Sequence, residues 1–404
     1  MTDGTVPRRT VLRGLALAGA AALASGCGQG PDLSTKTTGR KPLWKHTFTT
    51  ADDGHIAPGS ENADLFPYSM AASAMTFYAS FEGRLYAFDV AGRQLWQSPY
   101  GHYNASPMYG RTAPLVMEDT LYTLRNEPDG KGTLQALDPG TGRLRWSFSP
   151  GGWLSPPAAS GGHVAVSSTD HLHCLDAATG KERWRARGDG AGFPGGPAIA
   201  DGVVCAVDGR MYLAGLDVKT GRTRWHVSGG TGGSTGAAGL FQAQCSITSD
   251  GGAVYIHSPS GLWAVSARDG KVRWSGTTAG GLTRVVPSGP FVYAAGTGGV
   301  SAIAAGNAAW TVPVPHWASG GDRPLALADG ALTFTTNGRV SNVDATSGAP
   351  RWTAAVKDFA GEDVPLSNAA AAARVVCVLA KDEAAADDTG NKHGPVDHLY
   401  AFPA

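Results

Sequence analysis

Residues 172–184 read LHCLDAATGKERW, and the fold of the chain follows from this stretch. The apolar run that ends at Asp176 predicts a short, half-buried β-strand. Asp176 can accept hydrogen bonds from turn amides, and Gly180 can take the positive φ that closes a hairpin. The strand that follows carries Trp184, a large flat side chain that can pack against a neighbouring sheet. The stretch therefore predicts a β-hairpin with a specialised turn.

The same pattern recurs along most of the chain, and a degenerate copy near residue 300, which ends at Trp310, lacks the aspartate. An alternating strand precedes each copy, which gives about four short strands per repeat, as in the blade of a β-propeller. Successive repeat tryptophans are 36 to 52 residues apart. We expect these side chains to pack blade against blade: Trp44, Trp96, Trp146, Trp184, Trp225, Trp274, Trp310 and Trp352.

The two ends of the repeat region complete each other. The region opens at Trp44 with a tryptophan strand that has no predecessor, and it closes at residues 399–402 with a strand that no tryptophan follows. Pairing of these two strands would close the ring and leave no open edge. The sequence therefore predicts an all-β, eight-bladed propeller over residues 42–404. A seven-bladed ring is the alternative if the copy at Trp310 is not a full blade.

Composition supports a folded repeat protein and argues against nucleic-acid binding. The chain has 404 residues, with 57 glycines, 25 prolines and 42% hydrophobic residues. This content provides a sizeable core and many tight turns. The formal net charge is zero, which removes the usual electrostatic argument for a nucleic-acid partner.

The first residues have the features of an export signal. Arg8 and Arg9 precede a short apolar run that ends in small residues just before Cys27. These are the parts of a signal peptide over residues 1–26, of twin-arginine type and with a lipobox, although Sec export stays an alternative. Residues 27–41 are polar and read as a flexible tether. We expect Cys27 to carry a lipid that anchors the protein to the outer face of the cytoplasmic membrane.

Four other cysteines lie in the repeat region. Cys174, Cys205 and Cys377 each occur in an apolar, strand-like run, and Cys245 does not. An exported protein can form disulfides, but small buried thiols fit such runs better. The disulfide state of all four stays open at this point.

The repeated unit, an apolar strand followed by Asp-x-x-Thr-Gly and then Trp, resembles the pyrroloquinoline quinone-like propeller repeat family. The resemblance covers residues 42–404. It implies a propeller but no single activity, because one fold hosts unrelated functions. Members of the family include quinoprotein dehydrogenases and non-enzymatic lipoproteins, one of which scaffolds outer-membrane protein assembly.

Connection lengths suggest which end of the ring binds a partner. If the strands of a blade are named A to D from the axis outward, the A–B and C–D turns are short, whereas the D–A and B–C connections vary in length. Variable loops on a rigid scaffold are where binding usually occurs. Aromatic and polar side chains in these connections form our candidate binding face. They are Tyr103, Asn104, Trp153, Phe193, Phe241, Gln242, Gln244, Arg284, His316, Trp317, Asp322, Arg323 and Asn368.

The quinoprotein interpretation needs more than the fold. The resemblance implies a cofactor held near adjacent cysteines, stacked on a tryptophan, with calcium and an aspartate base. No two cysteines are adjacent here, and no acidic cluster has calcium-loop spacing. Asp322 beside Arg323 and Trp317 is the nearest fragment of such a site. We expect no cofactor, with pyrroloquinoline quinone and calcium as the alternative.

Metal binding and catalysis find little further support. His171 and His173 share one face of a strand, but a single His-x-His pair more often reflects two ordinary strand histidines. We therefore predict a non-catalytic, lipid-anchored propeller outside the cytoplasm that binds a protein or an envelope component. A quinone-dependent dehydrogenase and a carbohydrate-binding or glycan-processing propeller are the alternatives.

Overall fold

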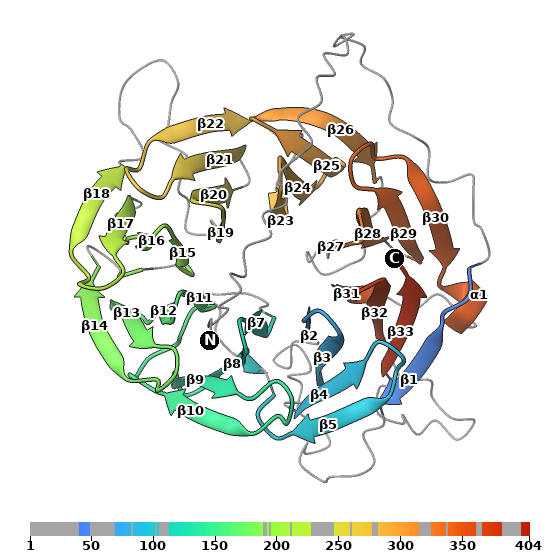
Figure 1. Cartoon of the computed structure of the whole chain (residues 1–404), viewed down its shortest axis with the longest axis horizontal. Helices are drawn as coiled ribbons and strands as arrows, with labels where there is room; N and C mark the ends of the chain where they lie inside the picture. The colour runs from blue at the N-terminus through green and yellow to red at the C-terminus, as the bar shows by residue number, and fades with distance from the viewer. Residues whose placement is uncertain are drawn as a thin grey trace, which may run out of the picture.

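A computed structural model shows eight β-sheets arranged as blades around a central axis (Figure 1). This arrangement confirms the eight-bladed propeller. The structure describes residues 40–48, 69–81, 84–101, 103–104, 113–188, 192–193, 195–210, 212–227, 246–258, 261–276, 282–314, 325–336, 338–360, 366–381 and 397–404.

Blades 1 to 4 follow one another along the chain, each with strands A to D from the axis outward. Blade 1 contains β2 (Ser69–Ala72), β3 (Thr76–Phe81), β4 (Arg84–Asp89) and β5 (Gln94–Ser98). Blade 2 contains β7 (Leu115–Met117), β8 (Thr120–Asn126), β9 (Gly132–Leu137) and β10 (Leu144–Phe148), and β6 (Tyr103–Asn104) pairs parallel with β8. Blade 3 contains β11 (Ala158–Ser160), β12 (His163–Ser167), β13 (His171–Asp176) and β14 (Glu182–Arg187). Blade 4 contains β15 (Ala198–Ala200), β16 (Val203–Val207), β17 (Leu213–Asp217) and β18 (Thr223–Val227).

Blades 5 to 8 complete the ring. Blade 5 contains β19 (Ser246–Asp250), β20 (Ala253–Ser258), β21 (Gly261–Ser266) and β22 (Val272–Gly276). Blade 6 contains β23 (Leu282–Ser288), β24 (Phe291–Gly296), β25 (Gly299–Ala304) and β26 (Asn307–Pro313). Blade 7 contains β27 (Leu325–Ala328), β28 (Ala331–Thr336), β29 (Arg339–Asp344) and β30 (Pro350–Ala355), and the short helix α1 (Lys357–Ala360) follows it. Blade 8 contains β31 (Leu366–Ala372), β32 (Val375–Lys381), β33 (Asp397–Pro403) and β1 (Trp44–Phe48).

The N-terminal strand closes the ring as the sequence predicts. β1 pairs antiparallel with β33, from Trp44 opposite Ala401 to Phe48 opposite Asp397. The N-terminal strand thus supplies the outer strand of the last blade. The degenerate copy at Trp310 forms a complete four-stranded blade, which rules out the seven-bladed alternative.

A β-bulge accompanies the repeat turn in blades 1 to 7. In blade 3 the register shifts between Cys174 and Leu175, so that Trp184 lies opposite Cys174 whereas Glu182 lies opposite Leu175. A bulge bends a strand and increases its twist. The outer strand therefore changes direction close to the residue that carries the indole ring.

The core lies in the layers between blades. The layer between blades 4 and 5, for example, joins Cys205 and Leu213 of blade 4 to Val254 and Ile256 of blade 5. Because each blade is covered on both faces, its middle strands are mostly buried, and all five residues of β12 are. The expectation of half-buried strands is thus wrong for the middle strands. It fits outer strands such as β14, where exposed and partly exposed residues alternate after Arg183.

Candidate functional site

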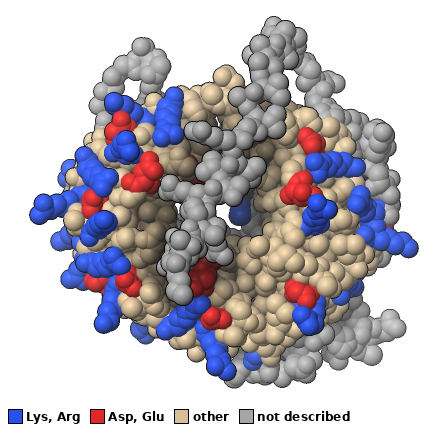
Figure 2. Space-filling view, in the orientation of Figure 1, with Lys and Arg blue, Asp and Glu red and all other residues tan. Residues whose placement is uncertain are grey.

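The antiparallel order of the strands gives the ring two different ends. The A–B and C–D turns lie at one end, which we call the turn end, and the B–C and D–A connections lie at the other, the loop end. The C–D turn of blade 3 spans residues 177–181, whereas the D–A connection after blade 4 spans 228–245. On the face shown in Figure 2, acidic and basic side chains lie next to one another around the rim.

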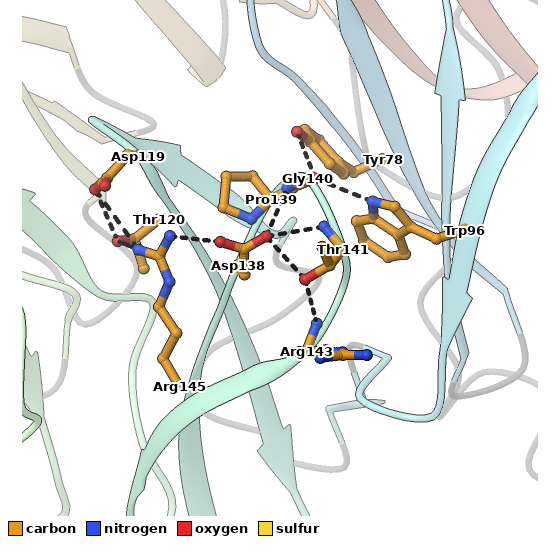
Figure 3. Close-up of polar contacts among 10 residues, drawn as sticks. All are labelled: Tyr78, Trp96, Asp119, Thr120, Asp138, Pro139, Gly140, Thr141, Arg143 and Arg145. Atoms are coloured by element: carbon orange, nitrogen blue, oxygen red, sulfur yellow. Dashed lines mark hydrogen bonds and ion pairs between the residues drawn. The ribbon is translucent and has the colours of Figure 1, made fainter.

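At the turn end, the repeat aspartate satisfies the polar groups of its own turn (Figure 3). One carboxylate oxygen of Asp138 accepts hydrogen bonds from the backbone N–H groups of Gly140 and Thr141, at 3.1 and 2.9 Å, and from the Thr141 hydroxyl at 2.8 Å. The other accepts from the Arg145 guanidinium at 2.7 Å. Arg145 is the main cause of the lowered pKa of Asp138, with Thr141 next. The same arrangement surrounds Asp176, Asp217 and Asp344.

The repeat tryptophan joins each blade to the next one. Trp146 lies against Gly180, whose φ is +69°, and a Cβ atom on this glycine would lie 2.6 Å from the indole. The indole Nε1 of Trp146 donates a hydrogen bond to the Ala177 carbonyl at 2.9 Å. The glycine is thus needed both for its φ and for the close approach of the ring. Equivalent contacts join Trp44 to Gly92, Trp96 to Gly142, Trp184 to Gly221, Trp225 to Gly270 and Trp310 to Gly348.

Two blades depart from this tryptophan–glycine contact, which we call the latch. Trp274 faces Gly306 in blade 6, whose turn lacks the aspartate. Trp352 faces blade 8, whose outer strand is the N-terminal β1. Its ring stacks on Phe402 at 5.6 Å between centroids, and the Arg40 guanidinium lies 5.5 Å from its ring centre. The latch therefore depends on the repeat turn, and the closing blade replaces the turn with aromatic and cationic contacts.

Three of the residues predicted for the binding face have described side chains at the loop end. Trp153 is half-buried, and its Nε1 donates to the Glu127 carbonyl at 3.0 Å, so it packs on the B–C turn of blade 2. Phe193 is 4% exposed and belongs to the core between blades 3 and 4. Arg284 lies partly exposed on β23, the innermost strand of blade 6. Packing thus accounts for the two aromatic residues, and Arg284 remains available for binding.

The other predicted residues are described only in part or not at all. Tyr103 and Asn104 form β6 and lie opposite Arg125 and Asn126 of β8, and Asn368 lies opposite Leu379. Outside the described residues lie Arg8, Arg9, Cys27, Phe241, Gln242, Gln244, Cys245, His316, Trp317, Asp322 and Arg323.

Buried polar atoms without a hydrogen-bond partner gather at the loop end. At this end they are Oγ of Ser69 and Ser167, Nδ1 of His257, Oγ1 of Thr335 and Nη1 of Arg339, each at the start of an A or C strand or near the end of a B strand. Away from this end, Oδ1 of Asn342 on β29 and Nε1 of Trp352 on β30 are also buried without a hydrogen bond. Leaving such an atom unpaired costs about 1–3 kcal/mol. The loop end therefore holds polar groups that a bound partner or water can satisfy.

His257 has a strongly lowered pKa at this end. His257 is 6% exposed on β20 and faces β23 of the next blade. Burial and, next, the positive charge of Arg284 lower the pKa of His257 to about 4, against the opposing effect of a hydrogen bond with the Leu282 backbone. His257 is consequently neutral at pH 7 and provides an uncharged ring nitrogen beside a cation.

The sequence reasoning did not single out His257 or Arg339. Binding residues were expected in the connections, whereas both residues belong to strands, close to the loop end. The available signal was a titratable residue inside a run of apolar ones, such as His257 after Val254 and Ile256. A charged or polar residue in such a run must be paired or must serve a site.

The described cysteines and strand histidines have structural roles. Cys174, Cys205 and Cys377 are buried and free in three different blades. Burial raises the pKa of Cys174 and of Cys205 to about 12 and also raises that of Cys377. These thiols are therefore poor nucleophiles and poor metal ligands.

His173 is held between two side chains of its own blade. It is 2% exposed, its Nδ1 lies 2.6 Å from Glu182 Oε1, and its Nε2 lies 2.9 Å from Ser168 Oγ. Both ring nitrogens are thus occupied. Across the described part of the chain, no group of three His, Cys, Asp or Glu residues is placed to hold a metal ion.

Solved structures share this fold at low sequence identity. The computationally designed Ika8 protein is 14% identical with a TM-score of 0.60, and the match covers 82% of this chain and 95% of that one. BamB from Moraxella catarrhalis is 17% identical with a TM-score of 0.52, covering 89% and 97%. Quinohemoprotein alcohol dehydrogenase from Comamonas testosteroni is 14% identical with a TM-score of 0.54, covering 83% and 74%. These likenesses show the fold alone.

Sequence comparison assigns the family. No curated protein matches the chain at a significant level. The family described as outer membrane protein assembly factor BamB matches residues 36–147 and 130–285, which together make up more than half of the chain. The matched segments contain the repeats whose turns and tryptophans form the latch. The chain therefore belongs to this family of pyrroloquinoline quinone-like repeat propellers.

Proposed function

We propose that this protein is a non-catalytic, lipid-anchored propeller outside the cytoplasm that binds an envelope protein through its loop end. One observation carries the proposal: buried polar atoms without partners gather at the loop end. At the turn end, in contrast, the repeat carboxylates are bonded within their own turns. A surface that leaves polar groups unsatisfied gains free energy when a partner supplies the missing hydrogen bonds.

The family supports a role in binding. Its description names an outer membrane protein assembly factor, and one structural neighbour is BamB. The export signal with Arg8 and Arg9, and the lipobox at Cys27, would place the propeller at the outer face of the cytoplasmic membrane. Within the described residues, no helix has the length and hydrophobicity needed to span a bilayer. We infer attachment by the lipid on Cys27.

The described residues do not fit a quinone site. One structural neighbour is a quinohemoprotein alcohol dehydrogenase, so the cofactor has to be considered. The described cysteines lie in different blades, and the described residues contain no cluster of three metal-ligating side chains. Trp153, a candidate for stacking on a sugar or a cofactor, uses its indole N–H within its own blade. The described residues thus give no positive support for a cofactor, and our proposal does not include one.

Photocrosslinking in the native membrane tests which end binds. A photoreactive amino acid replaces Thr297, exposed in the B–C turn of blade 6, or Thr346, exposed in the C–D turn of blade 7. We expect mass spectrometry to identify a protein captured from position 297 and not from 346. Capture from 346 alone would reverse the assignment of the binding end. Capture from neither position, with intact protein in the membrane fraction, would contradict a protein-binding role.

The anchor is tested separately. Replacing Cys27 with serine removes the thiol that the lipid would modify. We expect Cys27→Ser to move the protein from the membrane fraction to the soluble fraction, with the melting temperature of the propeller unchanged. Retention of the variant in the membrane fraction after a high-salt wash would argue against lipid attachment at this residue.

A further inference from the structure

Two arginines line the same gap between blades at the loop end. Arg284 lies opposite Ala295, a member of the core layer between blades 6 and 7, so its side chain starts on the wall of blade 6 that faces blade 7. Arg339 precedes Ser341 by two residues, and Ser341 lies opposite Phe334 of the same layer. Arg339 therefore starts on the wall of blade 7 that faces blade 6. Both residues lie near the start of their strands, at the loop-end opening of the layer between blades 6 and 7, which we call the mouth.

Neither guanidinium has an acidic partner among the described residues. Nη1 of Arg339 is buried without a hydrogen bond, and neither Arg284 nor Arg339 forms an ion pair with another described residue. At the turn end the situation is the reverse, because Arg145, Arg183 and Arg351 each pair with the aspartate of their own turn. Arg284 is partly exposed, but the buried Nη1 of Arg339 is costly without a partner, so a partner of opposite charge is the simplest explanation for its retention.

The chemistry of the two guanidinium groups indicates the kind of partner. His257 is not part of this mouth, because it lies opposite Leu262 of the layer between blades 5 and 6. Arginine is always charged and offers several N–H groups in a planar fork, which matches the two oxygens of a carboxylate. The two guanidinium groups thus have the donors and the charge to hold carboxylates.

We propose that the loop-end mouth between blades 6 and 7 binds carboxylate groups of an acidic polypeptide segment, with Arg284 and Arg339 as the charged contacts. The inference rests on the proposed function, because it takes the loop end as the surface that meets the partner. It adds the chemistry of the partner, which should present Asp, Glu or a C-terminal carboxylate to this gap. The uncharged remainder of the partner would then lie over neighbouring blades.

Binding of a labelled polyglutamate peptide to the full chain tests the proposal by fluorescence anisotropy. The test variant is Arg284→Gln with Arg339→Gln. The matched control is Arg185→Gln with Arg187→Gln, which removes the same charge from exposed positions on β14. We expect the test variant to weaken binding by about tenfold or more and the control by less than about twofold. Polyglutamine should not bind, and inorganic phosphate should compete no better than chloride at the same ionic strength.

Each outcome of the binding experiment supports or overturns the carboxylate site. An equal loss of affinity in the control would show general charge attraction, and effective competition by phosphate would assign the site to phosphate; both overturn the proposal. The melting temperature of the test variant should stay the same or rise, because an unpaired buried guanidinium nitrogen is removed, whereas a fall would indicate a structural role. If crosslinking captures a partner at position 297 and the test variant retains it, the proposed function stands and the carboxylate site fails. If the peptide binds as expected and no partner is captured, the carboxylate site stands and the proposed function fails.

Discussion

The turn end and the loop end of the propeller are made by the same strands but treat their polar groups in opposite ways. At the turn end, Asp138 pairs with Arg145 and with the amides of its turn. At the loop end, Nη1 of Arg339 and Nδ1 of His257 are buried without partners. The repeated residues are thus used to join blades, and the residues that vary between blades are available for binding. The following predictions test this division.

Two tryptophans of blade 2 give the largest expected difference. Trp146 is 8% exposed and latches blade 2 to blade 3, whereas Trp153 is half-buried at the loop end. We expect Trp146→Ala to lower the free energy of unfolding by about 4 kcal/mol, since it empties a packed site. Trp153→Ala should cost about half as much, because part of its ring faces solvent. Urea denaturation of both variants measures this difference, and equal losses would contradict the division between the two ends.

Two glycines of blade 3 show whether the latch or the turn conformation sets the cost. Gly161 and Gly180 both have positive φ, but a Cβ on Gly161 meets no atom within 4 Å, whereas one on Gly180 meets the ring of Trp146. We expect Gly161→Ala to cost about 1 kcal/mol from backbone strain and Gly180→Ala about 3 kcal/mol from strain and overpacking. Similar melting temperatures for the two variants would show that the ring moves aside easily.

His257 makes stability depend on pH through the loop end. Burial, followed by the charge of Arg284, lowers its pKa to about 4 in the folded protein, against 6.5 for an ordinary histidine. Between these values the unfolded chain binds more protons, so this contribution is complete above pH 6.5 and is lost as pH falls towards 4. We expect the protein to lose about 2 kcal/mol from this residue by pH 5. Denaturation of the wild type and of His257→Gln at pH 7 and pH 5 measures the effect.

The variant provides the control for other titrating groups. Burial also lowers the pKa of His46 and, despite Glu182, that of His173, and both residues remain in His257→Gln. Only the difference between the two pH profiles therefore reports on His257. Parallel profiles would show that this histidine is already solvated at the loop end.

Sequence reasoning predicted what repeats and missed what does not. The Asp, Gly and Trp of the repeat recur at fixed spacing, so the blade, the turn and the closure between Trp44 and Ala401 were predictable. The bulge beside Leu175 was not, because no residue type marks it. Trp153 and Phe193 were predicted to bind because they lie in variable connections, and the structure shows that both take part in packing. Neighbouring blades determine that packing, and one sequence does not show them.

The candidate site was predictable only in part for a related reason. Arg284 was identified from its place near a variable connection, but its relation to Arg339 depends on which faces of two blades meet. That relation emerges only from the register of β23 with β24 and of β28 with β29. A strand residue changes its face when the register shifts by one, and the bulge next to Arg284 produces such a shift.

The smallest expected effects separate the two functions of the repeat aspartate. Asp138→Ala removes the acceptor for the amides of Gly140 and Thr141, and we expect a loss of about 1 kcal/mol, as for the loss of a helix N-cap. Arg145→Gln removes partly exposed ion pairs with Asp138 and Asp119 and a hydrogen bond to the Thr120 hydroxyl. It should cost about 0.5 kcal/mol, with the ion-pair part of this loss vanishing in high salt. Since Arg145 and then Thr141 lower the pKa of Asp138, its contribution is present above the ordinary aspartate pKa and is lost as pH falls below it. If Arg145→Gln were instead as costly as Asp138→Ala, the ion pair would hold the turn. An ion pair would then contribute more stability than we infer, and the loop-end arginines, which have no acidic partner among the described residues, would forgo that contribution. This result would strengthen the argument that a partner binds them.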